Sequence, residues 1–292
     1  MVKYSWVLLS LISAFCLATS DALVKKSLEQ GDEYLVALSR LLFTLPLLFL
    51  LLLAPAPALD KQFYLAFFTA LPLELITIVL YTRALKVSPM SLTLPFLSLT
   101  PLSLIMISYL LLGEKVSPRG TIGIFFIASG SYVLNIGDIR KGLFGPFRVI
   151  AKEKGPVLMI MVALLYGITS ALGKMAIEHS SPLFFASTYS IGLCIAFAPL
   201  ALLMGKGDLK ASTSGRNLRT LVLAGLFNAV MIITHMLAMK LANVAYMISV
   251  KRVSMLISVV YGYLFFKENN IGARISGAAL MLIGFVLMVT AH

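Results

Sequence analysis

Ten long apolar segments follow one another along the chain with short connections between them, and they restrict its fold more than any other feature. They are residues 6–23, 34–53, 63–81, 90–112, 120–136, 157–177, 183–203, 218–239, 244–266 and 271–289. A helix needs about 20 apolar residues to cross a bilayer. Because lipid offers no partner for backbone polar groups, such segments form helices or barrel strands, and the absence of strict alternation favours helices. The sequence therefore predicts an all-α integral membrane protein with ten transmembrane helices.

The composition leaves little room for anything outside these segments. Of the 292 residues, 60% are hydrophobic and 12% are charged, whereas an ordinary soluble domain has about 45–50% and about 25%. Ten spans would use roughly 200 residues, which excludes a sizeable aqueous domain. We therefore expect a multi-pass protein of the cell membrane.

Basic residues outnumber acidic ones by 24 to 12, which gives a formal net charge of +12. In a soluble protein this excess would suggest nucleic acid, but in a membrane protein it is usually loop charge that faces the cytoplasm and anionic lipid. We expect contacts with membrane lipid and no nucleic-acid partner. Cys16 and Cys194 lie inside apolar segments, so we interpret them as packing residues rather than as part of a disulfide framework or a metal site.

The two halves of the chain resemble each other. Each half carries a glutamate that is followed by two glycines at the same spacing, nine and then seven residues. These residues are Glu114, Gly123 and Gly130 in the first half and Glu268, Gly277 and Gly284 in the second. Residues 22–25 similarly match residues 171–174. Chance similarity between apolar helices is the alternative. A duplicated unit with an odd number of spans must enter the membrane from opposite sides, so we predict two inverted five-helix repeats with a binding site between them.

Several short motifs give the chain a family resemblance. They are Tyr81-Thr-Arg-Ala84-Leu85, Ser88-Pro89, the prolines Pro95 and Pro101 of the fourth segment, and Leu110-Leu-Leu-Gly113-Glu114. The chain resembles the EamA-type transporters of the drug/metabolite transporter superfamily. The resemblance implies five-helix repeats at residues 1–137 and 157–292, joined by a basic loop at residues 138–156.

The same resemblance implies what such a protein does. EamA-type proteins are secondary transporters that work by alternating access, on substrates that include amino acids, nucleotide sugars and phosphorylated sugars. We therefore expect a transporter without enzymatic activity or cofactor. The resemblance also implies that Glu114 and Glu268 are structural residues at helix connections. Pro95 and Pro101 are expected to interrupt the fourth helix.

Five charged residues lie inside the predicted spans, where a charge is costly and requires a reason. They are Asp21, Arg40, Glu74, Lys251 and Arg252. Asp21 is expected to pair with Lys25, one helical turn further on. Arg40 is either a packing cation or a ligand for substrate.

Two polar pairs occupy equivalent positions in the two halves. Glu74 and Tyr81 are seven residues apart, and so are Asn228 and His235, which places each pair on one helix face. Hydrogen bonding between helices would explain both pairs. The alternative is a cavity lining in which Glu74 or His235 takes up a proton.

Lys251 and Arg252 form a basic dipeptide in the ninth segment, where the first half has Leu97 and Ser98. Neighbouring helical residues point about 100° apart, so the two side chains cannot both face lipid. The arrangement resembles that of the plastid sugar-phosphate translocators, in which a Lys-Arg pair on this helix grips the substrate phosphate. The alternative is structural: a buried pair of Lys251 or Arg252 with Glu74, or of Arg40 with Asp21.

The sequence thus predicts a secondary transporter of a small polar metabolite, either anionic or zwitterionic, that couples to protons or a counter-substrate. The predicted substrate-binding residues are Lys251, Arg252, Arg40, Glu74, Tyr81, His235 and Asn228. An amino-acid or drug exporter with purely structural charges is one alternative. A membrane-embedded transferase that uses Glu74 and His235 is another. Gly-rich phosphate loops and the common hydrolase motifs do not occur in the sequence.

Orientation stays open at this point. With ten spans both termini lie on one side, where the sequence places six Lys and Arg residues, against fifteen on the other side. The positive-inside rule would place the termini outside the cell. The family resemblance implies that they lie in the cytoplasm.

Overall fold

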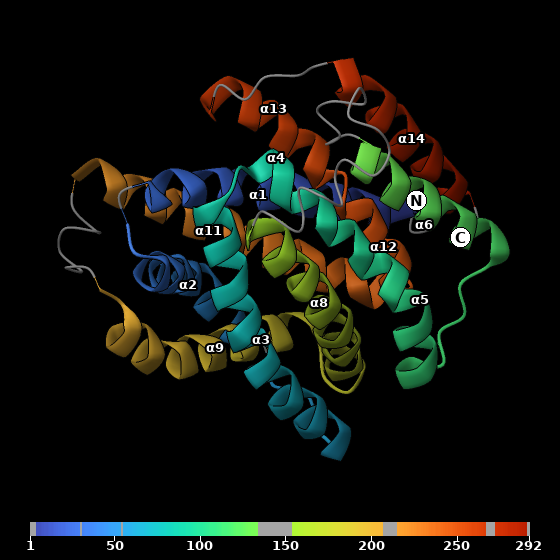
Figure 1. Cartoon of the computed structure of the whole chain (residues 1–292). Coiled ribbons are helices and arrows are strands. Elements are labelled where there is room, and N and C mark those ends of the chain that lie inside the picture. Colours follow the sequence, from blue (N-terminus) through green and yellow to red (C-terminus); the bar gives the residue numbers. More distant parts are fainter. Residues whose placement is uncertain are drawn as a thin grey trace.

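The computed structural model describes residues 4–29, 31–53, 55–133, 154–206, 215–266 and 272–290, and every regular element within them is a helix (Figure 1). The first half contains α1 (Ser5–Leu28), α2 (Glu33–Phe49), η2 (Leu50–Leu53), α3 (Lys61–Val87), α4 (Met90–Thr93), η3 (Leu94–Ser98), α5 (Leu99–Leu112) and α6 (Pro118–Val133). The second half contains α8 (Lys154–Glu178), α9 (Pro182–Met204), α11 (Gly215–Leu241), α12 (Val244–Lys251), α13 (Ser254–Phe266) and α14 (Gly272–Val289). Each predicted segment is helical over its described residues apart from a turn at residues 252–253, which confirms the all-α prediction.

Six of the described helices are each long and apolar enough to cross a membrane on their own. They are α1, α2 with η2, α3, α8, α9 and the part of α11 from Asn217 to Leu241. The apolar helices Phe96–Leu112 and Ser276–Val289 are shorter. The fourth and ninth predicted spans are each divided into two pieces, as described below.

Helices α2 and α3 each begin at an aspartate whose side chain accepts hydrogen bonds from the otherwise unpaired N–H groups of the first turn. The Asp32 carboxylate accepts a hydrogen bond of 2.9 Å from the Tyr34 N–H at the start of α2. Asp60 accepts one of 2.9 Å from Phe63 at the start of α3. Each start lies just outside an apolar segment, so the polar caps set the ends of the spans.

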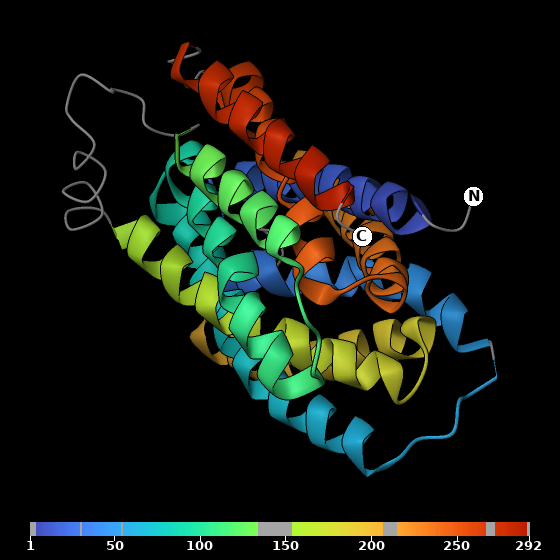
Figure 2. The ribbon, with the colours of Figure 1, turned by 90° about the vertical axis from the view of Figure 1, so that its right-hand side faces the viewer.

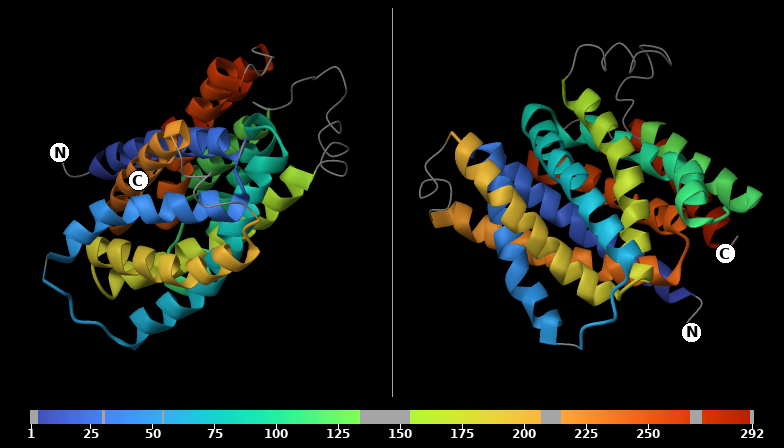
Figure 3. Two further views of the ribbon diagram at one scale, coloured as in Figure 1. Left: turned by 90° about the vertical axis from the view of Figure 1, so that its left-hand side faces the viewer. Right: turned by 90° about the horizontal axis from the view of Figure 1, so that it is seen from below.

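The two halves pack through contacts that occur twice with the halves exchanged. Helix α1 of the first half packs along α11 of the second half. Helix α8, the equivalent of α1 in the second half, packs along α3, the equivalent of α11 in the first half (Figure 3). The pairs α5 with α8 and α13 with α1 are related in the same way. This exchange is what a twofold relation between the repeats requires, and it confirms the predicted inverted repeat.

The glycines that revealed the repeat lie where α6 crosses α14 (Figures 1 and 2). Gly123 lies against Gly284, where a Cβ atom would come within 2.8 Å of the Gly284 carbonyl oxygen. Gly130 lies against Gly277, with a corresponding distance of 2.6 Å. The pairing is crossed, so the two helices run antiparallel. Glycine is required here because the two backbones touch.

In each half, one lysine caps the C-terminus of the third helix. Lys25 on α1 donates hydrogen bonds to two carbonyls at the end of α3. Lys174, its equivalent on α8, donates to the carbonyl oxygens of Met239 (2.5 Å) and Ala242 (3.0 Å) at the end of α11. A cation is favourable at a helix C-terminus, where the carbonyl groups lack partners. The match between residues 22–25 and 171–174 therefore has a structural cause.

Glu114 connects the halves on the side of the chain termini. Its carboxylate accepts a hydrogen bond of 2.9 Å from the Val244 N–H at the start of α12 and lies 3.7 Å from Lys174 Nζ. Burial raises the pKa of Glu114 above its usual value, although Val244 and Lys174 act in the opposite direction. These contacts agree with a structural role. Glu268, its equivalent, lies outside the described residues.

Both fourth helices of the repeats are interrupted, and only one interruption has a proline. In the first half the chain changes to 3₁₀ geometry over Leu94–Ser98, where Pro95 lies, as expected. In the second half α12 ends at Lys251 and α13 begins at Ser254. The Val253 N–H bonds three residues back, to the Val250 carbonyl, over 3.0 Å. No proline or glycine in the ninth segment near this point predicted the second interruption, which lies at the basic dipeptide.

Candidate functional site

A cavity of about 210 Å³ lies between the two halves. Its wall is formed by α1, α2, α3 and η3 from the first half and by α8, α9, α11 and α12 from the second. All of the residues that the sequence nominated for substrate binding lie on this wall: Lys251, Arg252, Arg40, Glu74, Tyr81, His235 and Asn228. The spacing of seven residues therefore identified the inner faces of α3 and α11.

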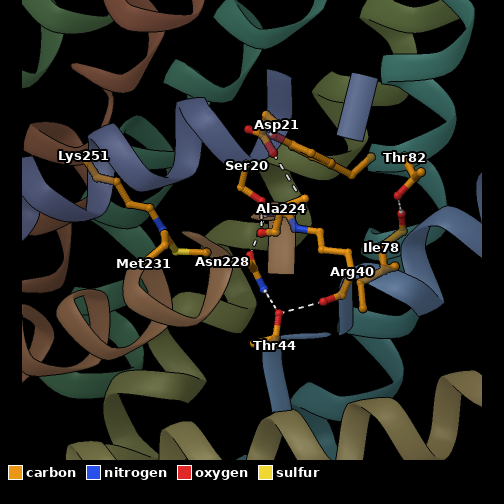
Figure 4. Close-up of polar contacts among 11 residues, drawn as sticks. Ser20, Asp21, Arg40, Thr44, Ile78, Thr82, Ala224, Asn228, Met231 and Lys251 are labelled. Carbon is orange, nitrogen blue, oxygen red and sulfur yellow. Dashed lines mark hydrogen bonds and ion pairs between the residues drawn. The ribbon is translucent and has the colours of Figure 1, made fainter. Parts of the chain in front are cut away.

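Arg40 is held by partners from two other helices (Figure 4). Its Nη1 lies 3.3 Å from the carboxylate of Asp21 on α1, and its Nη2 donates a hydrogen bond of 2.7 Å to the side-chain oxygen of Asn228 on α11. Asn228 in turn donates to the Thr44 hydroxyl over 3.0 Å. The Nε of Arg40 has no hydrogen-bond partner among the residues that the structure describes.

Asp21 differs from its sequence-based prediction. Its carboxylate pairs with Arg40 and also accepts a hydrogen bond of 2.5 Å from the Tyr81 hydroxyl. Its expected partner Lys25 instead caps α3. A buried carboxylate can pair with a residue one turn away on its own helix or with donors on neighbouring helices. Here Arg40 and Tyr81, on neighbouring helices, are the stronger donors. The structural alternative for Arg40, a buried pair with Asp21, is the arrangement found.

Lys251 and Arg252 are buried at the break between α12 and α13. Lys251 Nζ lies 3.1 Å from His235 Nδ1 and donates a weak hydrogen bond of 3.2 Å to the sulfur of Met231 (Figure 4). Arg252 is 4% exposed, and in the described ranges its Nε has no hydrogen-bond partner. Within the described part of the chain, neither side chain forms an ion pair with a carboxylate.

Glu74 lies on the α3 side of the cavity, half-buried. Thr169 on α8 lines the same cavity. The alternative in which Glu74 neutralises Lys251 or Arg252 by a direct ion pair is not seen among the described residues. The carboxylate is therefore available to a solute in the cavity.

Sequence reasoning missed a wall of hydroxyl groups on the second half. It consists of Tyr166, Thr169, Ser170, Tyr189 and Ser190, from α8 and α9. The Tyr189 hydroxyl is buried without a hydrogen-bond partner, and its ring stacks on Phe185 with centroids 4.9 Å apart. These residues are uncharged members of long apolar helices, so no feature of the sequence set them apart from packing residues.

The arrangement favours a small anion. A guanidinium and an ammonium group that lack a carboxylate partner attract acid groups strongly where water is scarce. Arginine supplies a planar fork of N–H donors, and lysine supplies a point charge. Hydroxyl groups and one carboxylate complete the wall, so the cavity also offers acceptors to hydroxyl or ammonium groups of a solute.

Comparisons with known proteins agree with this architecture. The protein-family model described as "EamA-like transporter family" matches residues 4–136 and again residues 153–290. A solved structure titled "Crystal structure of protein" is similar over 97% of this chain and 96% of that chain, with a TM-score of 0.75 and 16% sequence identity. At that identity the likeness shows a shared fold. Among curated proteins, no sequence matches the chain.

Proposed function

The chain belongs to the EamA-like transporter family, in the drug/metabolite transporter superfamily, and we propose that it carries a small anionic or zwitterionic metabolite across the cell membrane. The observation that supports this substrate class is the basic pair Lys251 and Arg252, which lines the cavity and has no carboxylate partner in the part of the chain that the structure describes. A phosphorylated compound or a carboxylate has the acid group that such a pair binds.

The remaining residues of the cavity have complementary roles in this proposal. Lys251, Arg252 and Arg40 bind the acid group. Glu74 and His235, on opposite halves, take up a proton or receive a substrate amine. Asn228 orients Arg40 directly, and Tyr81 orients it through the hydrogen bond that it donates to Asp21. The transport step needs neither a cofactor nor a chemical reaction.

Transport follows from the inverted repeat. The cavity lies between the halves, and each half makes equivalent contacts with the other. Two inverted repeats can exchange their conformations, which opens the same site first to one side of the membrane and then to the other. We propose that this alternating access is secondary active, coupled to protons or a counter-substrate.

A thermal-shift screen of the purified protein tests the substrate class. Phosphorylated sugars, nucleotides, carboxylates and amino acids are compared, because a ligand that binds only the folded state raises the unfolding temperature. The best ligand is then used for counterflow in proteoliposomes with Lys251→Ala and Arg252→Ala. We expect either substitution to weaken binding by at least about tenfold. Folded variants with unchanged affinity would refute anchoring by the basic pair.

One observation favours a second candidate, an amino-acid or drug exporter whose intramembrane charges only brace helices. Arg40 and Asp21 already form such a brace. If bracing were their whole role, the exchange Asp21→Arg with Arg40→Asp would restore transport that either single substitution abolishes. No such charge exchange can be made for Arg252, because it has no acidic partner among the described residues.

A further inference from the structure

A buried carboxylate lies directly behind one of the basic residues of the cavity. Asp21 is 2% exposed and does not line the cavity itself. One of its oxygens pairs with Arg40 at 3.3 Å, and the other accepts the Tyr81 hydroxyl at 2.5 Å. Both Arg40 and Tyr81 line the cavity. Asp21 therefore acts on the cavity through these two side chains.

Arg40 is incompletely satisfied in this arrangement. Asp21 forms an ion pair with one of its terminal nitrogens and Asn228 accepts a hydrogen bond from the other, while its Nε has no hydrogen-bond partner among the described residues. A guanidinium carries five N–H donors, and they favour a bidentate acid group over two separate acceptors. An acid group in the cavity would therefore compete with Asp21 for Arg40.

We propose that Asp21 is a positioning residue that holds Arg40 in place of the substrate's acid group while the cavity is empty, and yields part of that guanidinium when an anion binds. The inference rests on the proposed function, because it needs an acid group to bind beside Lys251 and Arg252. Such a group brings a second negative charge to Arg40, and like charges close together repel each other. The contact between Asp21 and Arg40 weakens as the substrate enters.

This exchange links occupancy of the cavity to the packing of the halves. Asp21 belongs to α1 and Arg40 to α2, whereas Asn228 belongs to α11 of the second half (Figure 4). Tyr81, the second partner of Asp21, belongs to α3. Because α1 packs along α11, loosening the Asp21–Arg40 contact acts on the surface along which the halves meet. The substrate thereby lowers the cost of the conformational change that carries it.

Binding of inorganic phosphate, and of the tightest anion from the screen above, to the full-length protein tests the inference. The proteins are wild type, Asp21→Asn, Arg40→Gln and the double variant. We expect Asp21→Asn to tighten binding by at least about threefold, since it removes a competing acid. The same substitution should leave affinity unchanged in the Arg40→Gln background. In counterflow, Asp21→Asn should lower KM and also lower the maximal rate. A residue that only braced helices would not tighten binding.

Glu29→Gln is the matched control, because Glu29 is an exposed acid that directly follows α1. It removes the same charge and should leave phosphate affinity unchanged. Equal tightening by Asp21→Asn in both Arg40 backgrounds would mean that charge alone acts, and it would overturn the positioning role. So would unchanged or weaker binding by Asp21→Asn with Arg40 intact.

Failure of the proposed function gives a different result. A folded wild type would then bind neither phosphate nor any anion of the screen, and the inference about Asp21 would be rejected together with the proposed function.

Asp21→Asn leaves Arg40 without its acidic partner, and this variant can fail to fold. In that case the comparison of Arg40→Gln with the double variant, which removes both charges, decides. We expect equal affinities, and a difference would overturn the proposal.

Discussion

At the scale of single residues, the two arginines of the cavity differ in whether the protein itself satisfies them. Arg40 pairs with the Asp21 carboxylate and donates to Asn228, whereas Arg252, which is 4% exposed, forms no ion pair with a carboxylate among the described residues. A buried charge without a partner is destabilising, and such residues persist where function needs them. Stability and binding should therefore respond differently to the two substitutions.

We predict that Arg252→Gln raises the stability of the ligand-free protein by about 1 kcal/mol while phosphate binding is lost. Arg40→Gln should instead lower stability by about 2–4 kcal/mol, because Asp21 is left buried without its partner. Thermal unfolding in detergent, with and without phosphate, measures both effects. Equal destabilisation by the two substitutions would show that Arg252 is also paired within the protein.

At the scale of helices, the repeats meet where backbones touch. We predict that Gly130→Ala destabilises the protein by about 1–3 kcal/mol, because the added Cβ would lie 2.6 Å from the Gly277 carbonyl oxygen on α14. The matched control is Gly173→Ala on α8, where the nearest atom is an ordinary 3.6 Å away. That substitution should be neutral or slightly stabilising, since alanine favours helix. The thermal unfolding temperatures of the two variants provide the comparison.

The helix connection at Glu114 should make stability depend on pH. Burial raises the pKa of Glu114 above its usual value of 4.5, so the folded protein holds this proton more tightly than the unfolded chain does. The contribution of Glu114 to stability is therefore fully present below the unfolded pKa and is lost as pH rises through the folded pKa. Between the unfolded and the folded pKa of Glu114, the unfolding temperature should fall with rising pH in wild type. It should fall less steeply in Glu114→Gln. Glu29→Gln should keep the slope, and an identical slope in Glu114→Gln would contradict the assignment.

At the scale of the whole molecule, contacts between loops agree with ten crossings. The Lys206 N–H donates to the Asp32 carboxylate over 3.4 Å, and His179 lies 2.6 Å from Asp60. Counting crossings along the chain places the first pair on one side of the membrane and the second on the other. Loops that share a side by this count are thus the ones in contact.

We predict that single cysteines at Lys61 and Lys206, both exposed positions, are labelled from opposite sides of the membrane. The background replaces Cys16 and Cys194, which are buried. An impermeant maleimide applied to intact cells should label one position, and the other only after the membrane is opened. Labelling of both from outside would refute the ten-span topology. The position that is labelled in intact cells faces the outside, which fixes the orientation of the protein in the membrane.

Periodicity and spacing in the sequence determined much of the site as well as the fold. Apolar segments of about twenty residues without strict alternation favour helices over barrel strands in lipid. The matched Glu and Gly spacings indicated the inverted repeat. The seven-residue spacing of Glu74 with Tyr81 and of Asn228 with His235 predicted that each pair shares one helix face, but it left open whether that face packs against another helix or lines a cavity. These conclusions hold because each depends on local geometry along a single helix.

Only the tertiary structure decided which buried charges have partners. It paired Asp21 with Arg40 rather than Lys25, left Arg252 without a carboxylate, and interrupted the ninth span although that span contains no proline. Helices in lipid are apolar on every face, so their hydrophobic pattern does not fix how they rotate against one another. Partners on different helices depend on that rotation, which is set when the two halves pack together.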